Sequence, residues 1–100
     1  MVNSNMPKGV MNADYFHDRK TKKHLIYRFK SRAFEAARLF QKYSVSSSKP
    51  NILDFGCADG FALTETHKLL DANSSLGVEY SEDLIKSAGT LPPSCSIIKG

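Results

Sequence analysis

Apolar residues are grouped along the chain in a way that predicts helices and short strands in turn. They recur at helical spacing in residues 26–43, and short apolar runs typical of buried strands follow. The predicted elements are a helix over 26–43, a strand over 51–55, a helix over 61–70, a strand over 76–80, a helix over 82–88 and a strand over 96–99. Strands that alternate with helices indicate an α/β fold with a parallel sheet.

Segments rich in serine, aspartate and proline separate these elements. They are residues 44–50, residues 71–75 and the pair Pro92-Pro93. The predicted organisation is a basic leader over 1–24, with residues 1–12 expected to be mobile, then an amphipathic helix and linker over 25–49, and an α/β unit over 50–100.

Residues 51–63 predict a buried strand, a turn that contains glycine, and the start of a helix. Gly56 and Gly60 allow a sharp turn and leave no side chain where a ligand must approach closely. The helix that follows offers backbone N–H groups at its first turn. We therefore expect the loop to bind a ligand through its backbone.

Two carboxylates beside this loop indicate the charge of the ligand. A dinucleotide fingerprint has three glycines spaced G-x-G-x-x-G, whereas the run here is Gly56-Cys57-Ala58-Asp59-Gly60. Asp54 and Asp59 would repel a pyrophosphate, but they could accept hydrogen bonds from an ammonium group or complement a sulfonium. A cationic ligand that carries adenosine fits better than NAD.

The run from Ile52 to Gly60 resembles the first motif of the class I S-adenosylmethionine-dependent methyltransferases, of the type 11/12 kind. That motif reads roughly as two hydrophobic residues, Asp or Glu, and then x-Gly-x-Gly-x-Gly, and Ala58 takes the place of its middle glycine. The resemblance implies that S-adenosyl-L-methionine is bound through Asp54, Gly56, Cys57, Ala58, Asp59 and Gly60.

A second short strand ends in a carboxylate at the separation that this family leads us to expect. Glu79 lies 19 residues after Gly60, and the ribose-binding carboxylate of Rossmann-like units falls about 20 residues after the glycine loop. By resemblance, Glu79 would bind the ribose hydroxyls and Tyr80 would pack beside the adenine. Tyr80 could equally cover the rim of the sheet. Ser81 is the expected cap of the next helix.

The resemblance covers about half of the chain, from Pro50 to Gly100. It implies a Rossmann-like three-layer fold truncated to about three parallel strands, with flanking helices and an N-terminal helix. The family's strand order would leave the first strand as an exposed apolar edge. We interpret the chain as the amino-terminal part of a methyltransferase domain, or a truncated one, whose methyl acceptor cannot be named and for which no catalytic residue is assigned.

Other classes of function stay open at this point. Gly56 and Gly60 could be turn glycines of another α/β domain, with Asp54 or Asp59 capping the helix. The chain could be a non-catalytic module that binds a cofactor or nucleic acid. A nucleotide-dependent oxidoreductase is a third reading, against which Ala58 and Asp59 argue.

Basic residues are concentrated in the first half of the chain. Residues 1–49 carry 11 Lys and Arg against 3 Asp and Glu, for a net charge of +8, while residues 50–100 carry −4. The densest stretch consists of Arg19, Lys20, Lys22, Lys23, Arg28, Lys30 and Arg32. Such a stretch could contact nucleic acid or anionic lipid. We favour an ordinary amphipathic helix with solvated cations, whose apolar residues face the sheet: Ile26, Phe29, Ala33, Ala36, Ala37, Phe40 and Tyr43.

The remaining chemistry predicts no further catalytic group. Cys57 and Cys95 lack zinc-type spacing, so we expect reduced thiols and no metal, and a nucleophilic role for Cys57 is not favoured. His67 is expected to be a surface or packing residue. A helix before the first motif covers the pocket in many of these methyltransferases, so Tyr15, Phe16, His17 and Arg19 are candidates for contact with cofactor or substrate.

No segment approaches the roughly 20 apolar residues that span a bilayer, and residues 1–10 lack the apolar core of a signal peptide. The sequence therefore predicts a cytoplasmic protein without a membrane partner. It makes no prediction of the oligomeric state.

Overall fold

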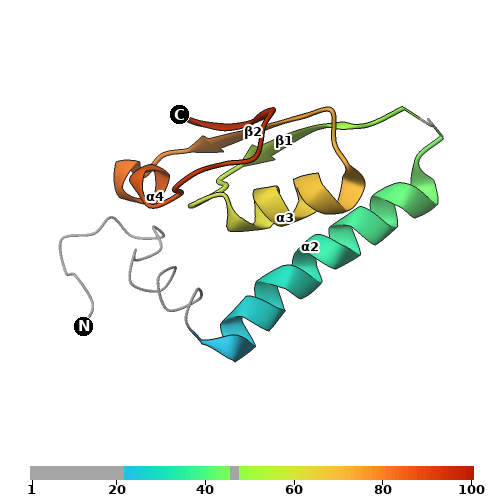
Figure 1. The fold of residues 1–100 in the computed structure, drawn as a ribbon, viewed down its shortest axis with the longest axis horizontal. Helices are drawn as coiled ribbons and strands as arrows, with labels where there is room; N and C mark the ends of the chain where they lie inside the picture. Colours follow the sequence, from blue (N-terminus) through green and yellow to red (C-terminus); the bar gives the residue numbers. More distant parts are fainter. Residues whose placement is uncertain (1–21, 46–47) are drawn as a thin grey trace.

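The computed structural model describes residues 22–45 and 48–100. In this part of the chain the longest helix comes first, and three strands then alternate with two shorter helices along the second half (Figure 1). The elements are helix α2 (Lys23–Tyr43), strand β1 (Asn51–Phe55), helix α3 (Phe61–Leu70), strand β2 (Ser74–Glu79), helix α4 (Glu82–Lys86) and strand β3 (Cys95–Lys99).

The strands form one parallel sheet in the order β1-β2-β3. Its register pairs Asp54 with Gly77, and Gly77 with Ile97. Because all strands run in the same direction, the turns that follow β1 and β2 meet at one edge of the sheet. The α/β fold with about three parallel strands is confirmed, and so is the position of β1 at the edge of the sheet.

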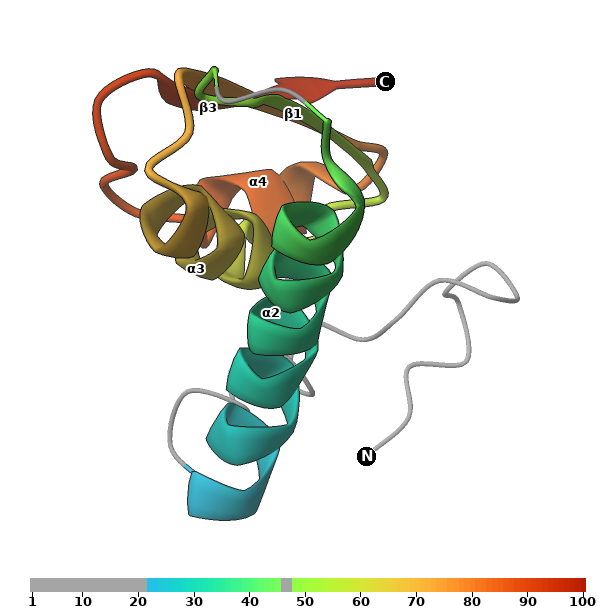
Figure 2. The ribbon, with the colours of Figure 1, turned by 90° about the vertical axis from the view of Figure 1, so that its right-hand side faces the viewer.

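Helices α2, α3 and α4 all lie on the same side of the sheet (Figures 1 and 2). The described residues thus supply the sheet and one helical layer. On the other face, the side chains of Leu53, Phe55 and Ile98 are 56%, 75% and 51% exposed. These apolar residues are exposed because none of the described helices covers this face of the sheet.

Helix α2 begins at Lys23, within the segment predicted as leader, and packs along α3. Ala33 and Ala37 are buried there, because their small side chains allow the two helices to approach closely. The expectation that the apolar residues of this helix face the sheet is therefore wrong. Phe40 and Tyr43, near the end of α2, are 39% and 70% exposed.

Four further boundaries differ from those expected, one of them the start of β3, which begins at Cys95 and so one residue early. Strand β2 begins at Ser74 and ends at Glu79, so it includes two serines that the sequence assigned to a linker and leaves Tyr80 outside. Ser75 is buried within the strand, where its Oγ lies 2.7 Å from Nδ1 of the buried His67 side chain. Helix α4 ends at Lys86, two residues early, and Ser81 caps it as predicted, because its Oγ accepts a hydrogen bond from the Leu84 N–H at 3.4 Å.

Candidate functional site

The turn between β1 and α3 adopts the left-handed backbone at three positions. The φ angles are +76° at Gly56, +54° at Ala58 and +80° at Gly60. Glycine adopts such angles at little cost, whereas an L-residue such as Ala58 is strained there. These three residues stand at the three glycine positions of the methyltransferase motif, and Ala58 adopts a left-handed backbone although it is not glycine.

Backbone hydrogen bonds join this turn to the neighbouring strand. The N–H groups of Gly56 and Cys57 donate to the carbonyl oxygen of Val78, at 2.7 and 3.2 Å. Within the turn, the Gly60 N–H donates to the carbonyl oxygen of Cys57 at 2.9 Å. The turn is therefore a fixed part of the sheet edge and not a loose loop.

Glu79, the last residue of β2, binds the turn with its carboxylate. Oε1 accepts a hydrogen bond from the Ala58 N–H at 2.8 Å, and Oε2 accepts one from the Ser81 N–H at 2.8 Å. The residue is buried, with 9% of its surface exposed. The structure thus brings Glu79 and the turn together, as the two sequence motifs led us to expect.

Asp54 lies on the same face of the sheet as Glu79, one strand away, and is partly buried. Burial raises the pKa of the Asp54 carboxyl above its usual value, and the negative charge of Glu79 raises this pKa further. The charge of Glu79 thus adds to burial in disfavouring the ionised form of Asp54 at the end of the sheet. A cation placed between them would relieve this repulsion.

Asp59 has a local role at the start of α3. It is buried, with 4% of its surface exposed, and its Oδ1 accepts a hydrogen bond from the Phe61 N–H at 3.2 Å. This bond satisfies one of the backbone N–H groups that the first turn of a helix leaves without an intrahelical partner. Asp59 thus contacts the first turn of the helix, as the sequence alternative of a helix-capping role suggested, although the N-cap residue itself is Gly60.

The thiol of Cys57 is buried between the turn and the sheet. Burial raises its pKa to about 11, and the charges of Asp54 and Glu79 contribute to the shift. A thiol with this pKa carries almost no thiolate at neutral pH, which argues against a nucleophilic role. Cys57 and Cys95 are both free cysteines.

Gly77 is a residue of the site that the sequence analysis missed. A Cβ atom at this position would lie 2.5 Å from Cys57 Sγ and 3.0 Å from Leu63 Cδ2. The absence of a side chain in the middle of β2 is what allows the turn and α3 to pack so closely against the sheet. Its position within a run predicted as a strand was the available signal, since an interior strand glycine often marks a close approach.

The other predicted site residues are only partly tested by the geometry. Tyr80 follows β2 and is 68% exposed, so its ring is open to a ligand. Tyr15, Phe16, His17 and Arg19 lie outside the described residues, as do the expected mobile segment 1–12 and the first two cations of the basic stretch. The cations of that stretch that lie in residues 22–32 are exposed, as expected for a solvated face.

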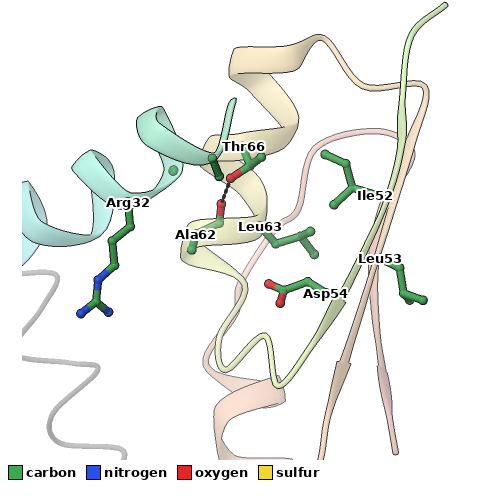
Figure 3. A pocket seen from close by; sticks show the side chains of 9 residues that line it. Arg32, Ile52, Leu53, Asp54, Ala62, Leu63 and Thr66 are labelled. Carbon is green, nitrogen blue, oxygen red and sulfur yellow. Dashed lines mark hydrogen bonds between the residues drawn. The ribbon is translucent and has the colours of Figure 1, made fainter. Parts of the chain in front are cut away.

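A pocket of about 300 Å³ opens beside Asp54, between α2, α3 and the edge strand β1 (Figure 3). It is lined by Arg32, Ala33, Ala36, Ile52, Leu53, Asp54, Ala62, Leu63 and Thr66. A second pocket, of about 570 Å³, lies between α2 and α3 and contains none of the predicted site residues. Of these two pockets in the described part of the chain, the first connects helix α2 with the first motif.

Among residues 22–45 and 48–100, no group of three or more His, Cys, Asp and Glu side chains is arranged to hold a metal ion. Within the same residues, no helix is both long enough and apolar enough to cross a membrane.

Comparison with solved structures identifies the fold. The chain is similar to the plantazolicin methyltransferase BpumL, solved with SAH, with a TM-score of 0.59 and 22% identity over 85% of this chain and 32% of that one. It is also similar to CalS10, an amino pentose methyltransferase from Micromonospora echinaspora solved with SAM (TM-score 0.61, 18% identity, 95% of this chain and 37% of that one). A third is the putative methyltransferase in complex with the Haloferax volcanii Trm112 activator (TM-score 0.52, 17% identity, 74% of this chain and 33% of that one).

These similarities show that the chain has the fold of the class I S-adenosylmethionine-dependent methyltransferases. The chain spans about a third of the length of the solved structures that it matches. No protein-family model matches the sequence, and neither does any curated protein.

Proposed function

We propose that this chain forms the cofactor-binding part of an S-adenosylmethionine-dependent methyltransferase. The observation that carries the proposal is the pair of carboxylates, Asp54 and Glu79, at the ends of adjacent parallel strands beside a turn with three left-handed positions. The carboxyl ends of such strands are where open α/β sheets bind their ligands. The methyltransferases that share the fold were solved with SAH or SAM.

The residues present fit this cofactor in charge and in shape. Negative potential at Asp54 and Glu79 favours a ligand that carries ammonium and sulfonium charges and disfavours a pyrophosphate. At Gly56, a Cβ atom would have no atom within 4 Å, so the surface above the turn is open to a ligand. When bound, S-adenosylmethionine supplies an electrophilic methyl group on a sulfonium.

Each residue then has a definite task. Asp54 accepts a hydrogen bond from the ammonium group of the cofactor, and the turn from Gly56 to Gly60 gives its backbone to close contact. Glu79 keeps acceptor capacity for the ribose hydroxyls, because each of its oxygens has a second lone pair beyond the N–H bond that it already accepts. Tyr80, exposed beside it, offers its ring to the adenine.

Methyl transfer from a sulfonium requires no nucleophile on the enzyme. Its rate arises from alignment of the acceptor with the methyl group and from exclusion of water. This agrees with a buried Cys57 whose pKa is about 11. The acceptor and the transfer activity belong to the whole protein, so they remain part of the proposal.

Isothermal titration with S-adenosylhomocysteine tests the proposal. Wild type should bind saturably, Asp54→Ala and Glu79→Ala should each weaken binding at least tenfold, and Glu82→Ala should not, because Glu82 is exposed and pairs with Lys99 at 3.0 Å. Titration with NADH should give no binding. Circular dichroism would establish that each variant is folded. Folded wild-type protein that binds NADH and not S-adenosylhomocysteine would favour the oxidoreductase alternative instead.

A further inference from the structure

The pocket beside Asp54 has charges of opposite sign on two of its walls. Of the nine residues that line it, only Arg32 and Asp54 are charged. Arg32 extends from α2 and Asp54 from β1, and both side chains line the pocket (Figure 3). The other polar side chain, Thr66, already donates its hydroxyl proton to the carbonyl oxygen of Ala62 at 2.8 Å.

Asp54 has no cation to balance it in the described part of the chain. Within residues 22–45 and 48–100, no hydrogen bond or ion pair joins its carboxylate to another side chain. The carboxylate is nevertheless partly buried and feels the charge of Glu79. A carboxylate in this position is ready to accept hydrogen bonds from a cationic ligand.

Arg32 is held in place without being neutralised. Its guanidinium lies 5.5 Å from the centre of the Phe29 ring, on the same helix, which is a cation–π contact. Within the residues that the structure describes, no carboxylate pairs with it. Arg38, six residues further along α2, instead forms an ion pair with Glu35 at 2.9 Å. Of the three arginines of α2, Arg32 lines the pocket, whereas Arg38 is paired on the surface of the helix itself.

We propose that Arg32 is a further cofactor-binding residue, which receives the α-carboxylate of S-adenosylmethionine across the pocket from Asp54. The inference rests on the proposed function and extends it to α2. The methionine end of this cofactor is a zwitterion, with an ammonium and a carboxylate on the same carbon. Asp54 complements the ammonium group, and Arg32 complements the carboxylate. The two oxygens of a carboxylate match the paired N–H donors of a guanidinium. Helix α2 would then take part in selecting the ligand as well as covering α3.

The test compares two ligands that differ only in the carboxylate. S-adenosylmethionine and decarboxylated S-adenosylmethionine are titrated into wild type, Arg32→Gln, Arg32→Lys and the control Arg38→Gln. We expect Arg32→Gln to weaken binding of S-adenosylmethionine by roughly tenfold and Arg32→Lys by less, in line with charge-assisted hydrogen bonds. Binding of the decarboxylated ligand should stay within about threefold of wild type in every variant, since the group that Arg32 contacts is gone.

The possible results separate this inference from the proposed function. If wild type binds S-adenosylmethionine and Arg32→Gln binds it equally well, the inference is wrong and the proposed function stands. Equal losses for both ligands in Arg32→Gln would also overturn it, because they would indicate a structural effect. If folded wild type binds neither ligand, the proposed function fails and the inference fails with it.

Discussion

The carboxylate of Glu79 accepts a hydrogen bond from the backbone N–H of Ala58, at 2.8 Å, and so joins the end of β2 to the turn after β1. Its second oxygen binds the Ser81 N–H at the start of α4. One buried side chain thus positions both loops at the edge of the sheet where the cofactor is proposed to bind. Glu79 consequently has a structural task in addition to its proposed contact with the ribose.

Glu79→Gln should therefore destabilise the fold. The glutamine side chain has one oxygen, which can accept a hydrogen bond from only one of the two N–H groups, those of Ala58 and Ser81. Its NH₂ group would face the other N–H, and two donors cannot form a hydrogen bond. We expect the free energy of unfolding to fall by about 1–3 kcal/mol, which is the usual cost of leaving a buried polar group unsatisfied. Urea unfolding measures the change. Glu82→Gln is the matched control, because its exposed ion pair with Lys99 contributes about 1 kcal/mol or less. Equal stability of Glu79→Gln and wild type would contradict the role of both hydrogen bonds.

Asp54→Asn should stabilise the ligand-free chain at pH 7 while weakening cofactor binding. The folded-state pKa of Asp54 is raised above 3.8, so folding favours its protonated form and the ionised form opposes folding. The contribution of protonated Asp54 to the free energy of unfolding is fully present below pH 3.8. It is lost as the pH rises through the raised pKa of the folded state. The advantage of Asp54→Asn should therefore be greatest at pH 7 and should shrink as the pH falls toward 4. Urea unfolding of both proteins across this range would reveal it, and an advantage independent of pH would count against the electrostatic cause.

Ala58→Gly tests the strain in the turn. At φ +54° an alanine is disfavoured by about 1–2 kcal/mol relative to its usual conformations, whereas glycine has no such penalty. Part of the gain is offset because glycine loses more conformational entropy on folding, so we expect a net stabilisation of about 0.5–1 kcal/mol. The control is Ala36→Gly, on the exposed surface of α2, which should destabilise by about 1 kcal/mol. Thermal unfolding of wild type, Ala58→Gly and Ala36→Gly measures these changes in stability. A loss of stability in Ala58→Gly would contradict the proposed strain at residue 58.

How much of this arrangement the sequence predicts depends on the range of the interactions involved. Strand β1 and helix α3 were predicted at their observed boundaries, because glycines and apolar runs mark them locally. Likewise, the spacing between Gly60 and Glu79 placed two motifs at one edge of the sheet, since parallel strands impose this relationship. The order of the strands followed from the resemblance to a family.

Features that depend on contacts between distant segments were not predicted. Helical periodicity identifies an apolar face but not the element against which it packs, so α2 was assigned to the sheet although it contacts α3. Ser74 and Ser75 look like linker residues in the sequence. They join β2 because the Ser74 Oγ donates to the Asn51 side chain at 2.7 Å and Ser75 pairs with His67. The position of Arg32 in the wall of the pocket likewise depends on how α2 crosses α3.

The Cys57 thiol should react only slowly with alkylating reagents in the folded chain. With a pKa of about 11, the fraction of thiolate at pH 8 is about a hundredfold below that of a thiol with the ordinary value of 9.0. Burial adds a steric barrier. In a Cys95→Ala background, which isolates Cys57, we expect alkylation by iodoacetamide to be at least a hundredfold slower in buffer than in 8 M urea, as followed by mass spectrometry. Comparable rates in both solutions would indicate an exposed, activated thiol.

The close packing of Gly77 against the turn gives the most specific test of the geometry. A Cβ atom at residue 77 would lie 2.5 Å from Cys57 Sγ, so Gly77→Ala must displace the turn or the strand. Overpacking of this kind costs about 1–3 kcal/mol. Because the sulfur atom is the nearest obstacle, Cys57→Ala should relieve part of the clash.

In a double-mutant cycle measured by urea unfolding, Gly77→Ala should therefore cost less in the Cys57→Ala background than in wild type, with a coupling energy of about 0.5–3 kcal/mol. If the two substitutions were simply additive, Cys57 would not be the group that requires glycine at this position. Gly89 provides the control, because a Cβ atom there has no neighbour within 4 Å and the cost of Gly89→Ala, which arises from its φ of +69°, should be the same in both backgrounds.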